Sequence, residues 1–153
     1  MKNFRHIVRI FTVFVISYLI YYNFQLSKKE IAKSNRLLHN NVAFEGIIVR
    51  IQRSNNHAFG IIELKLIKCN VNDFYKSIVH NEFKGIYPYR IKNDLAELYT
   101  TISNDIKVDD SVKVVSNDLT IYYNLQKGYE EGSLYMISEG SDLNYVRENT
   151  TFK

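Results

Sequence analysis

Two segments with alternating apolar and polar positions follow residue 41. Residues 42–53 read VAFEGIIVRIQR, and Ile47, Val49 and Ile51 fall on one side of a chain with a period of two. Residues 59–67 read FGIIELKLI and follow the turn-forming letters SNNH. A period of two with β-branched residues is typical of half-buried strands, so these segments predict a hairpin.

Shorter runs of the same kind continue along the chain. The interval 72–79 favours one or two helical turns with Asn72 as the cap, and 94–102 is ambiguous between helix and strand. Five or more short strands separated by polar turns favour a mainly β barrel over a doubly wound α/β domain. Beyond the hairpin, strands are expected at 87–92, 106–115, 119–124 and 133–137.

Two glycines and an acidic pair mark special backbone positions. Gly46 and Gly60 lie near the starts of the first two strands, where a glycine indicates a bulge or the close approach of a neighbouring strand. Asp109 and Asp110 precede an apolar alternation. Adjacent side chains on a strand point to opposite faces, so the pair is interpreted as a turn whose side chains bond the backbone, not as two catalytic carboxylates.

An uncharged run of 18 residues lies near the N-terminus. Residues 10–27 read IFTVFVISYLIYYNFQLS, about the minimum length for a membrane-spanning helix. Arg9 and Lys28 bracket the run, and tyrosines cluster toward its end as in an interfacial aromatic belt. A cleaved signal peptide needs a small-residue cleavage site, which does not follow the run. We therefore expect one N-terminal transmembrane helix that stays attached as an anchor.

The organisation that follows has three parts. Residues 1–27 form the membrane anchor, 28–41 a polar stalk or linker, and 42–153 a β-barrel domain with a polar C-terminal tail. Basic residues flank the anchor on both sides, three before and four after. The short basic N-terminal tail resembles that of an export signal, so we expect a single-pass membrane protein with the barrel on the extracytoplasmic side.

The distribution of charge argues against nucleic acid as a partner. Residues 1–40 hold seven basic residues and one acidic residue, whereas residues 41–153 hold 13 basic and 15 acidic residues. The chain is +4 overall, but the anchor region is +6 and the domain is −2. A phosphate backbone requires a positive surface, so no nucleic-acid partner is expected for the domain.

Two short motifs support a resemblance to a known type of domain. The segment Phe44-Glu45-Gly46-Ile47-Ile48-Val49-Arg50-Ile51 has the form F-x-G-x-[IV]-x-x-[IV], and residues 106–114 read IKVDDSVKV. Both motifs resemble those of small OB-like or SH3-like β-barrels, in particular uncharacterised bacterial proteins with a single span before such a barrel. Many such barrels have glycine where this chain has Asp109. The resemblance covers about residues 42–138 and implies a mainly β fold, a small OB-like or SH3-like β-barrel preceded by one N-terminal transmembrane helix, in a bacterial envelope. It implies no catalytic residues.

Candidate catalytic and metal-binding residues are few. Cys69 is the only cysteine, and with His80 it suggests one alternative, a small thiol-dependent hydrolase. A buried structural role is favoured for Cys69 because it closes an apolar strand. The four histidines are scattered without metal-ligand spacing, so no metal and no cofactor are expected.

Tyrosine is the one residue type with a suggestive distribution. Nine of the twelve tyrosines lie beyond residue 41, where most suit half-buried β surfaces. Tyr87, Tyr89 and Tyr122 are candidates for a stacking face that binds sugar, peptide or a partner protein. The function expected from the sequence is a non-enzymatic, membrane-anchored β-barrel module that binds a protein or envelope-polymer partner.

Overall fold

A computed structural model describes residues 2–55, 58–75 and 85–152, with side chains from residue 11 onward. The chain divides into two compact units, residues 1–34 and residues 35–153. Because the placement of the units relative to each other is not determined, each is described by itself.

The first unit is helical. Helix α1 runs from Lys2 to Leu38, and its last turn, from Asn35, belongs to the second unit. Between Phe11 and Leu26, twelve large hydrophobic side chains are 40–69% exposed, on all faces of the helix. No helix of the described residues is both long and apolar enough to cross a membrane. The membrane span expected from the sequence, residues 10–27, begins at Ile10, and the structure describes side chains only from residue 11 onward.

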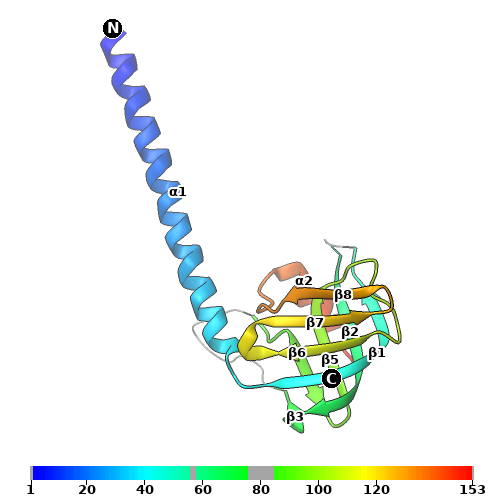
Figure 1. Ribbon diagram of the computed structural model, residues 1–153. Coiled ribbons are helices and arrows are strands. Elements are labelled where there is room, and N and C mark those ends of the chain that lie inside the picture. The colour runs from blue at the N-terminus through cyan, green and yellow to red at the C-terminus, as the bar shows by residue number, and fades with distance from the viewer. Residues whose placement is uncertain (1, 56–57, 76–84, 153) are drawn as a thin grey trace. The chain divides into compact units, whose positions relative to one another are not determined.

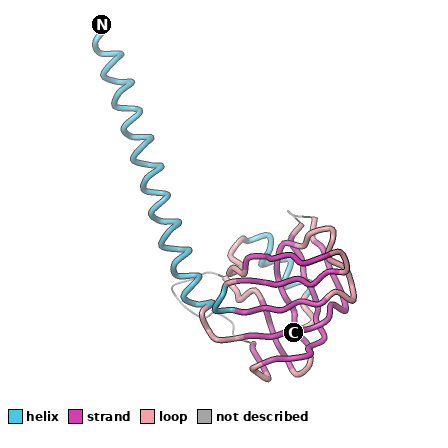
Figure 2. Tube along the Cα trace, viewed as in Figure 1, coloured by secondary structure: helices cyan, strands magenta, loops and turns pink. Residues whose placement is uncertain are grey.

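The second unit is mainly β, with one open antiparallel sheet of eight strands (Figures 1 and 2). The sheet order is β3-β4-β5-β2-β1-β6-β7-β8, so the long β1–β2 hairpin lies at its centre. The strands are β1 (Ala43–Arg53), β2 (Phe59–Cys69), β3 (Asp73–Phe74), β4 (Tyr89–Lys92), β5 (Leu95–Thr101), β6 (Ser111–Val115), β7 (Thr120–Leu125) and β8 (Gly128–Ser133). The short helix η1 (Ser116–Asp118) joins β6 to β7, and α2 (Gly140–Asn149) follows β8.

The two glycines of the hairpin lie where the neighbouring strand leaves no room for a side chain. A Cβ on Gly46 would lie 2.6 Å from the Lys65 carbonyl oxygen, and one on Gly60 would collide with the Gln52 carbonyl oxygen and lie 2.7 Å from Ile102 Cδ1. The register between the strands also shifts at Glu45/Gly46. The predicted close approach is therefore found at both glycines, and the predicted bulge at Gly46 alone, since Gly60 pairs with Arg53 in regular register.

Both halves of the sheet bury their inner faces in one hydrophobic core. Ile62, Leu64 and Leu98 come from the β2–β5 half, and Phe44 and Val114 from the β1–β6 half. Leu38, at the end of α1, is fully buried in the same core. A second cluster lies on the outer side of β2 and β5, where α2 packs; it consists of Phe59, Ile61, Tyr99, Ile137 and Val146.

The acidic pair is the predicted turn. Asp109 has a left-handed backbone with φ of 74°, and the adjacent Asp110 is 3% exposed. The Asp110 carboxylate accepts hydrogen bonds from the backbone N–H of Lys107 at 2.8 Å and of Gln126 at 3.1 Å. One acceptor oxygen thus fixes the backbone before β6, and the other fixes the turn between β7 and β8.

Several element predictions are corrected by the structure. The ambiguous segment 94–102 contains strand β5. Where helical turns were expected at 72–79, the described residues 72–75 contain strand β3, and residues 76–79 lie outside the described residues. The final strand is Gly128–Ser133, not 133–137: Tyr129 and Glu131 of this edge strand face outward, whereas Glu130 and Gly132 lie on the face of the buried Tyr123 ring. Helix α2 was missed because its apolar positions are few.

Replacing Gly60 tests the close approach within the hairpin. We expect Gly60→Ala to lower the free energy of unfolding by about 2–3 kcal/mol, because the added methyl group must displace backbone of β1. Gly140→Ala is the matched control: no atom lies within 4 Å of its Cβ, and alanine favours the start of α2, so stability should be unchanged or slightly higher. Urea unfolding followed by circular dichroism measures both. Equal stability of the two variants would contradict the crowding.

Candidate functional site

A buried carboxylate on β5 fixes the segment that follows α2. Glu97 is 1% exposed. Its Oε2 accepts hydrogen bonds from the Tyr99 hydroxyl at 2.7 Å and the Thr150 hydroxyl at 2.6 Å. Its Oε1 accepts from both the backbone N–H and the hydroxyl of Thr151, each at 2.7 Å. Four donors to one carboxylate offset its loss of hydration and hold residues 150–151 against the sheet.

Arg90 on β4 complements this carboxylate. It is the cross-strand partner of Glu97, and one of its guanidinium nitrogens donates to the Phe152 carbonyl oxygen at 3.2 Å. The guanidinium carbon lies 4.8 Å from the centre of the Tyr75 ring and 5.9 Å from that of Tyr99. The positive charge therefore lies between two aromatic faces, beside the buried negative charge of Glu97.

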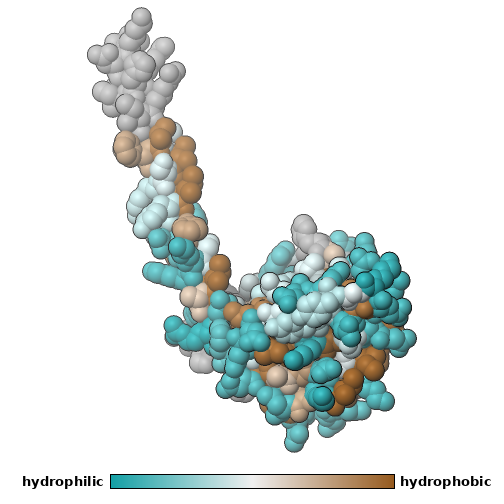
Figure 3. Space-filling model, viewed as in Figure 1, coloured by the Kyte–Doolittle hydropathy of each residue, from teal (hydrophilic) through white to brown (hydrophobic). Residues whose placement is uncertain are grey.

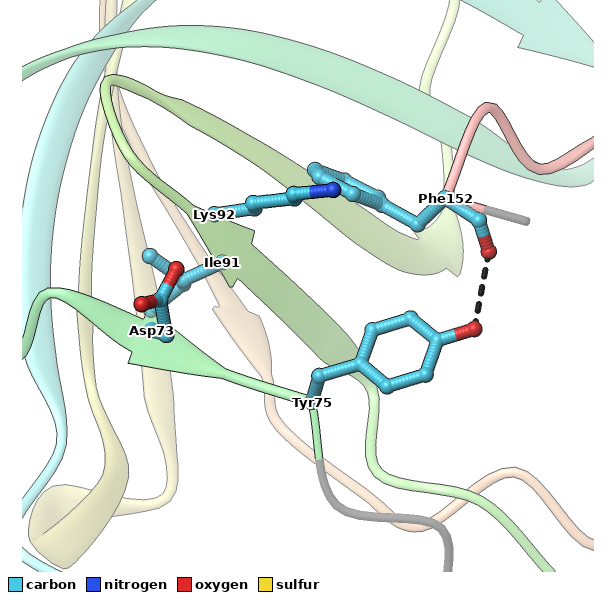
Figure 4. Close-up of a pocket in the computed structure, with 5 residues that line it drawn as sticks. All are labelled: Asp73, Tyr75, Ile91, Lys92 and Phe152. Carbon is cyan, nitrogen blue, oxygen red and sulfur yellow. Dashed lines mark hydrogen bonds between the residues drawn. The ribbon is translucent and has the colours of Figure 1, made fainter.

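A pocket of about 410 Å³ lies beside this network, on the side of β3 and β4. Figure 4 shows the Lys92 side chain extending toward the Phe152 ring, while the Tyr75 hydroxyl donates to the Phe152 carbonyl oxygen at 3.0 Å. Asp73 and Lys92 are cross-strand partners and place one charge of each sign in the lining. The volume lies within the range of small-ligand sites. Its lining is Asp73, Tyr75, Ile91, Lys92 and Phe152.

Two of the three tyrosines chosen from the sequence lie together, but inside the domain. Tyr89 is fully buried, its hydroxyl donates to Asn40 Oδ1 at 2.9 Å, and its ring packs against Phe44 and Phe74. Tyr87 is half-buried, with its ring centre 6.3 Å from that of Tyr89. The Tyr89 ring therefore has no face free to stack on a ligand.

The third tyrosine lies elsewhere. Tyr122 is on β7 and half-buried, and its ring stacks with that of Tyr129 on β8, with ring centres 6.2 Å apart. The structure thus separates the three candidates into a core pair and a surface residue.

The thiol candidate lies at the rim of a second pocket. Cys69 is half-buried and free, and it lines a pocket of about 390 Å³ together with Glu45, Lys68 and Lys113. His80 lies outside the described residues, so the pairing of its ring with the Cys69 thiol stays a prediction. Among the described residues, no three histidine, cysteine or acidic side chains gather into a possible metal site.

The residues that build the Glu97 network were missed by sequence reasoning. Glu97 lies 53 residues from Thr150, so no local pattern joins them. The one available signal was a lone acidic residue among apolar neighbours in the segment LAELYTT, since such a residue in a two-sided buried strand requires distant donors.

Comparison of the chain with protein-family models, with curated proteins and with solved structures finds no match. The site is therefore interpreted from its own geometry.

Removing the charge of Glu97 tests its role in holding the C-terminal segment. We expect Glu97→Gln to lower the free energy of unfolding by about 3 kcal/mol, because an amide presents an N–H₂ group to donors that need an acceptor. Amide hydrogen exchange at Thr151 should accelerate as well. Glu148→Gln, an exposed substitution on α2, is the control and should change neither. Unchanged exchange at Thr151 in Glu97→Gln would contradict the network.

The buried phenols predict a loss of stability at alkaline pH. Burial raises the pKa of Tyr89 and of Tyr123 from 10.0 to about 12 in the folded protein. The folded state favours the neutral phenol, so this contribution, about 2–3 kcal/mol per residue, is complete below pH 10 and is lost as pH rises toward 12.

The variant Tyr89→Phe isolates the contribution of one buried phenol to this pH-dependent stability. This variant should be less stable near pH 8 by about 1 kcal/mol, through loss of the Asn40 hydrogen bond, but its stability should fall less steeply between pH 10 and pH 12. Urea unfolding across pH 8–12 measures the slope, and Tyr135→Phe, at an exposed ring, serves as control. An unaltered slope in Tyr89→Phe would refute the assignment.

Proposed function

We propose that this chain is a non-enzymatic binding module, anchored to a bacterial envelope membrane through residues 10–27, whose β domain binds a protein or envelope-polymer partner. The observation that carries this proposal is the apolar surface of α1. Soluble monomers rarely leave so much contiguous apolar surface in water.

The apolar surface surrounds the helix instead of forming one stripe. Phe11, Phe14, Tyr18 and Ile20 are each 65–69% exposed, and brown side chains follow one another along the helix in Figure 3. A helix that is apolar on all faces suits immersion in hydrocarbon better than attachment along one side. The uncharged run 10–27 has a helical length of about 27 Å, close to the ~30 Å of a bilayer core.

A barrel-like closure of the sheet, in the manner of small OB-like or SH3-like barrels, would give the domain a rigid binding surface. Two observations support it. Ile86 and Ile137, outside the named strands and near opposite ends of the sheet order, exchange two backbone hydrogen bonds of 2.9 and 3.0 Å. Both halves of the sheet also share a single core.

A binding role fits the chemistry of the pocket beside β3 and β4. Its lining combines an acid, a base and two aromatic rings, groups that fix the orientation of a ligand. The nearby Glu97 carboxylate has both oxygens engaged by structural donors, so its position favours support of the fold over proton transfer. Domain orientation on the extracytoplasmic side is part of the proposal.

Membrane attachment is tested by alkaline carbonate extraction of cells that express the full chain. The wild-type protein should stay in the membrane pellet. The double variant Ile16→Asp/Leu19→Asp should move to the supernatant, because each buried carboxylate costs about 2.5–3.5 kcal/mol at the centre of a membrane helix.

A matched control places the same charge on the same helix outside the apolar run. Ala32→Asp lies at an exposed position and should remain in the pellet. A wild-type chain found in the supernatant, or equal pelleting of all three proteins, would overturn membrane anchorage. A C-terminal reporter active only outside the cytoplasm then tests the orientation, and an inactive reporter would reverse it.

A further inference from the structure

The outer face of β6, β7 and β8 carries two neighbouring tyrosine rings, the exposed Tyr129 and the half-buried Tyr122. Lys113 on β6 pairs with Tyr122 on β7, and Tyr122 pairs in turn with Glu131 on β8. In the next row, Asn124 on β7 pairs with Tyr129 on β8. Directly opposed residues of antiparallel strands share a face, so these five side chains lie together. The opposite face of the same strands holds core residues such as Val112 and Ile121.

The two rings are held nearly parallel. Their planes differ by 28° and their centres are 6.2 Å apart. The Tyr129 hydroxyl donates to Glu131 Oε1 at 3.1 Å, and the Tyr122 hydroxyl donates to Asp118 Oδ2 at 3.4 Å. Lys113 Nζ lies 6.0 Å from the Tyr122 ring centre. These contacts restrict the orientations of both rings before any ligand arrives, which lowers the entropy cost of binding.

The two rings differ in accessibility. Tyr129 is 59% exposed and Tyr122 is half-buried, while their neighbours Lys113, Asn124 and Glu131 are exposed. Figure 3 shows a pale area, the colour of residues of intermediate hydropathy, over β7 and β8 and surrounded by hydrophilic side chains. Flat aromatic surface with polar groups at its edge is thus available on this side of the domain.

The charges at the edge select among possible ligands. Among these five side chains, Lys113 carries the one positive charge and Glu131 the one negative charge. Asp118, which accepts the hydrogen bond from the Tyr122 hydroxyl, adds a second negative charge beside them. A phosphate-rich or otherwise anionic polymer would meet these carboxylates, so a neutral ligand is favoured.

We propose that Tyr122 and Tyr129 form a stacking platform for the pyranose rings of a neutral glycan. The apolar C–H face of a sugar ring packs on the aromatic faces, while its hydroxyls exchange hydrogen bonds with Asn124, Lys113 and Glu131. This inference rests on the proposed function, because it names the class of envelope polymer that the module binds.

The test uses the full chain in a detergent without sugar groups. Hexamers of β-1,4-linked glucose and of β-1,4-linked N-acetylglucosamine are titrated by calorimetry, with poly(glycerol phosphate) as the anionic comparison. At least one neutral hexamer should bind, and Tyr129→Ala and Tyr122→Ala should each weaken its affinity about tenfold, since one ring of stacking area is lost.

Tyr135→Ala is the matched control, because this tyrosine is 39% exposed but lies outside the platform. Its affinity for the hexamer should equal that of the wild type. Failure of both neutral hexamers to bind, tighter binding of the anionic polymer, or equal losses in all three variants would overturn the inference. Carbonate extraction of Tyr129→Ala is run in parallel: pelleting like the wild type shows that such a failure concerns the glycan site and not membrane anchorage.

Discussion

The close contact between β1 and β2 is the constraint on which the rest of the domain depends. These strands lie at the middle of the sheet order, with β5, β4 and β3 on one side and β6, β7 and β8 on the other. Because Gly46 and Gly60 carry no Cβ, the two backbones approach where a side chain would collide. The register shifts along β1 bend the strand. The bend allows both halves of the sheet to enclose the same hydrophobic residues, which a flat sheet of eight strands would leave on one open face.

Two buried carboxylates complete this arrangement where regular pairing ends. Asp110 accepts from the backbone of Lys107 and Gln126, and Glu97 accepts from Thr150 and Thr151 together with Tyr99. Each carboxylate thus accepts hydrogen bonds from two residues that lie outside the strands. They are Lys107 and Gln126 for Asp110, and Thr150 and Thr151 for Glu97. The energetic consequence is the same in both places: a buried charge is tolerated because its acceptors are saturated, and the irregular segment is ordered because its donors are used.

The elements that could be predicted from the sequence are those that local chemistry determines. The alternation in 42–53 and 59–67 gave β1 and β2, and the Asp109-Asp110 turn followed from the backbone preferences of aspartate. Strand β8 could not be found because GYEEGS has almost no apolar residue; it is an edge strand held by pairing with β7. Segment 94–102 resolves as a strand only through its two neighbours, β2 and β4.

The candidate surfaces show the same limit more sharply. Sequence reasoning selected Tyr87, Tyr89 and Tyr122 as one group, but register decides which rings meet. The Tyr89 side chain turns inward with Phe44, whereas Tyr122 turns outward and meets Tyr129 diagonally across β7 and β8. The composition of a strand therefore shows that aromatic rings are present, while only the pairing shows which face each ring occupies. A stacking surface on a β domain is a property of register, and the outward row beside Tyr122 exists because β8, an edge strand without an apolar pattern, pairs where it does.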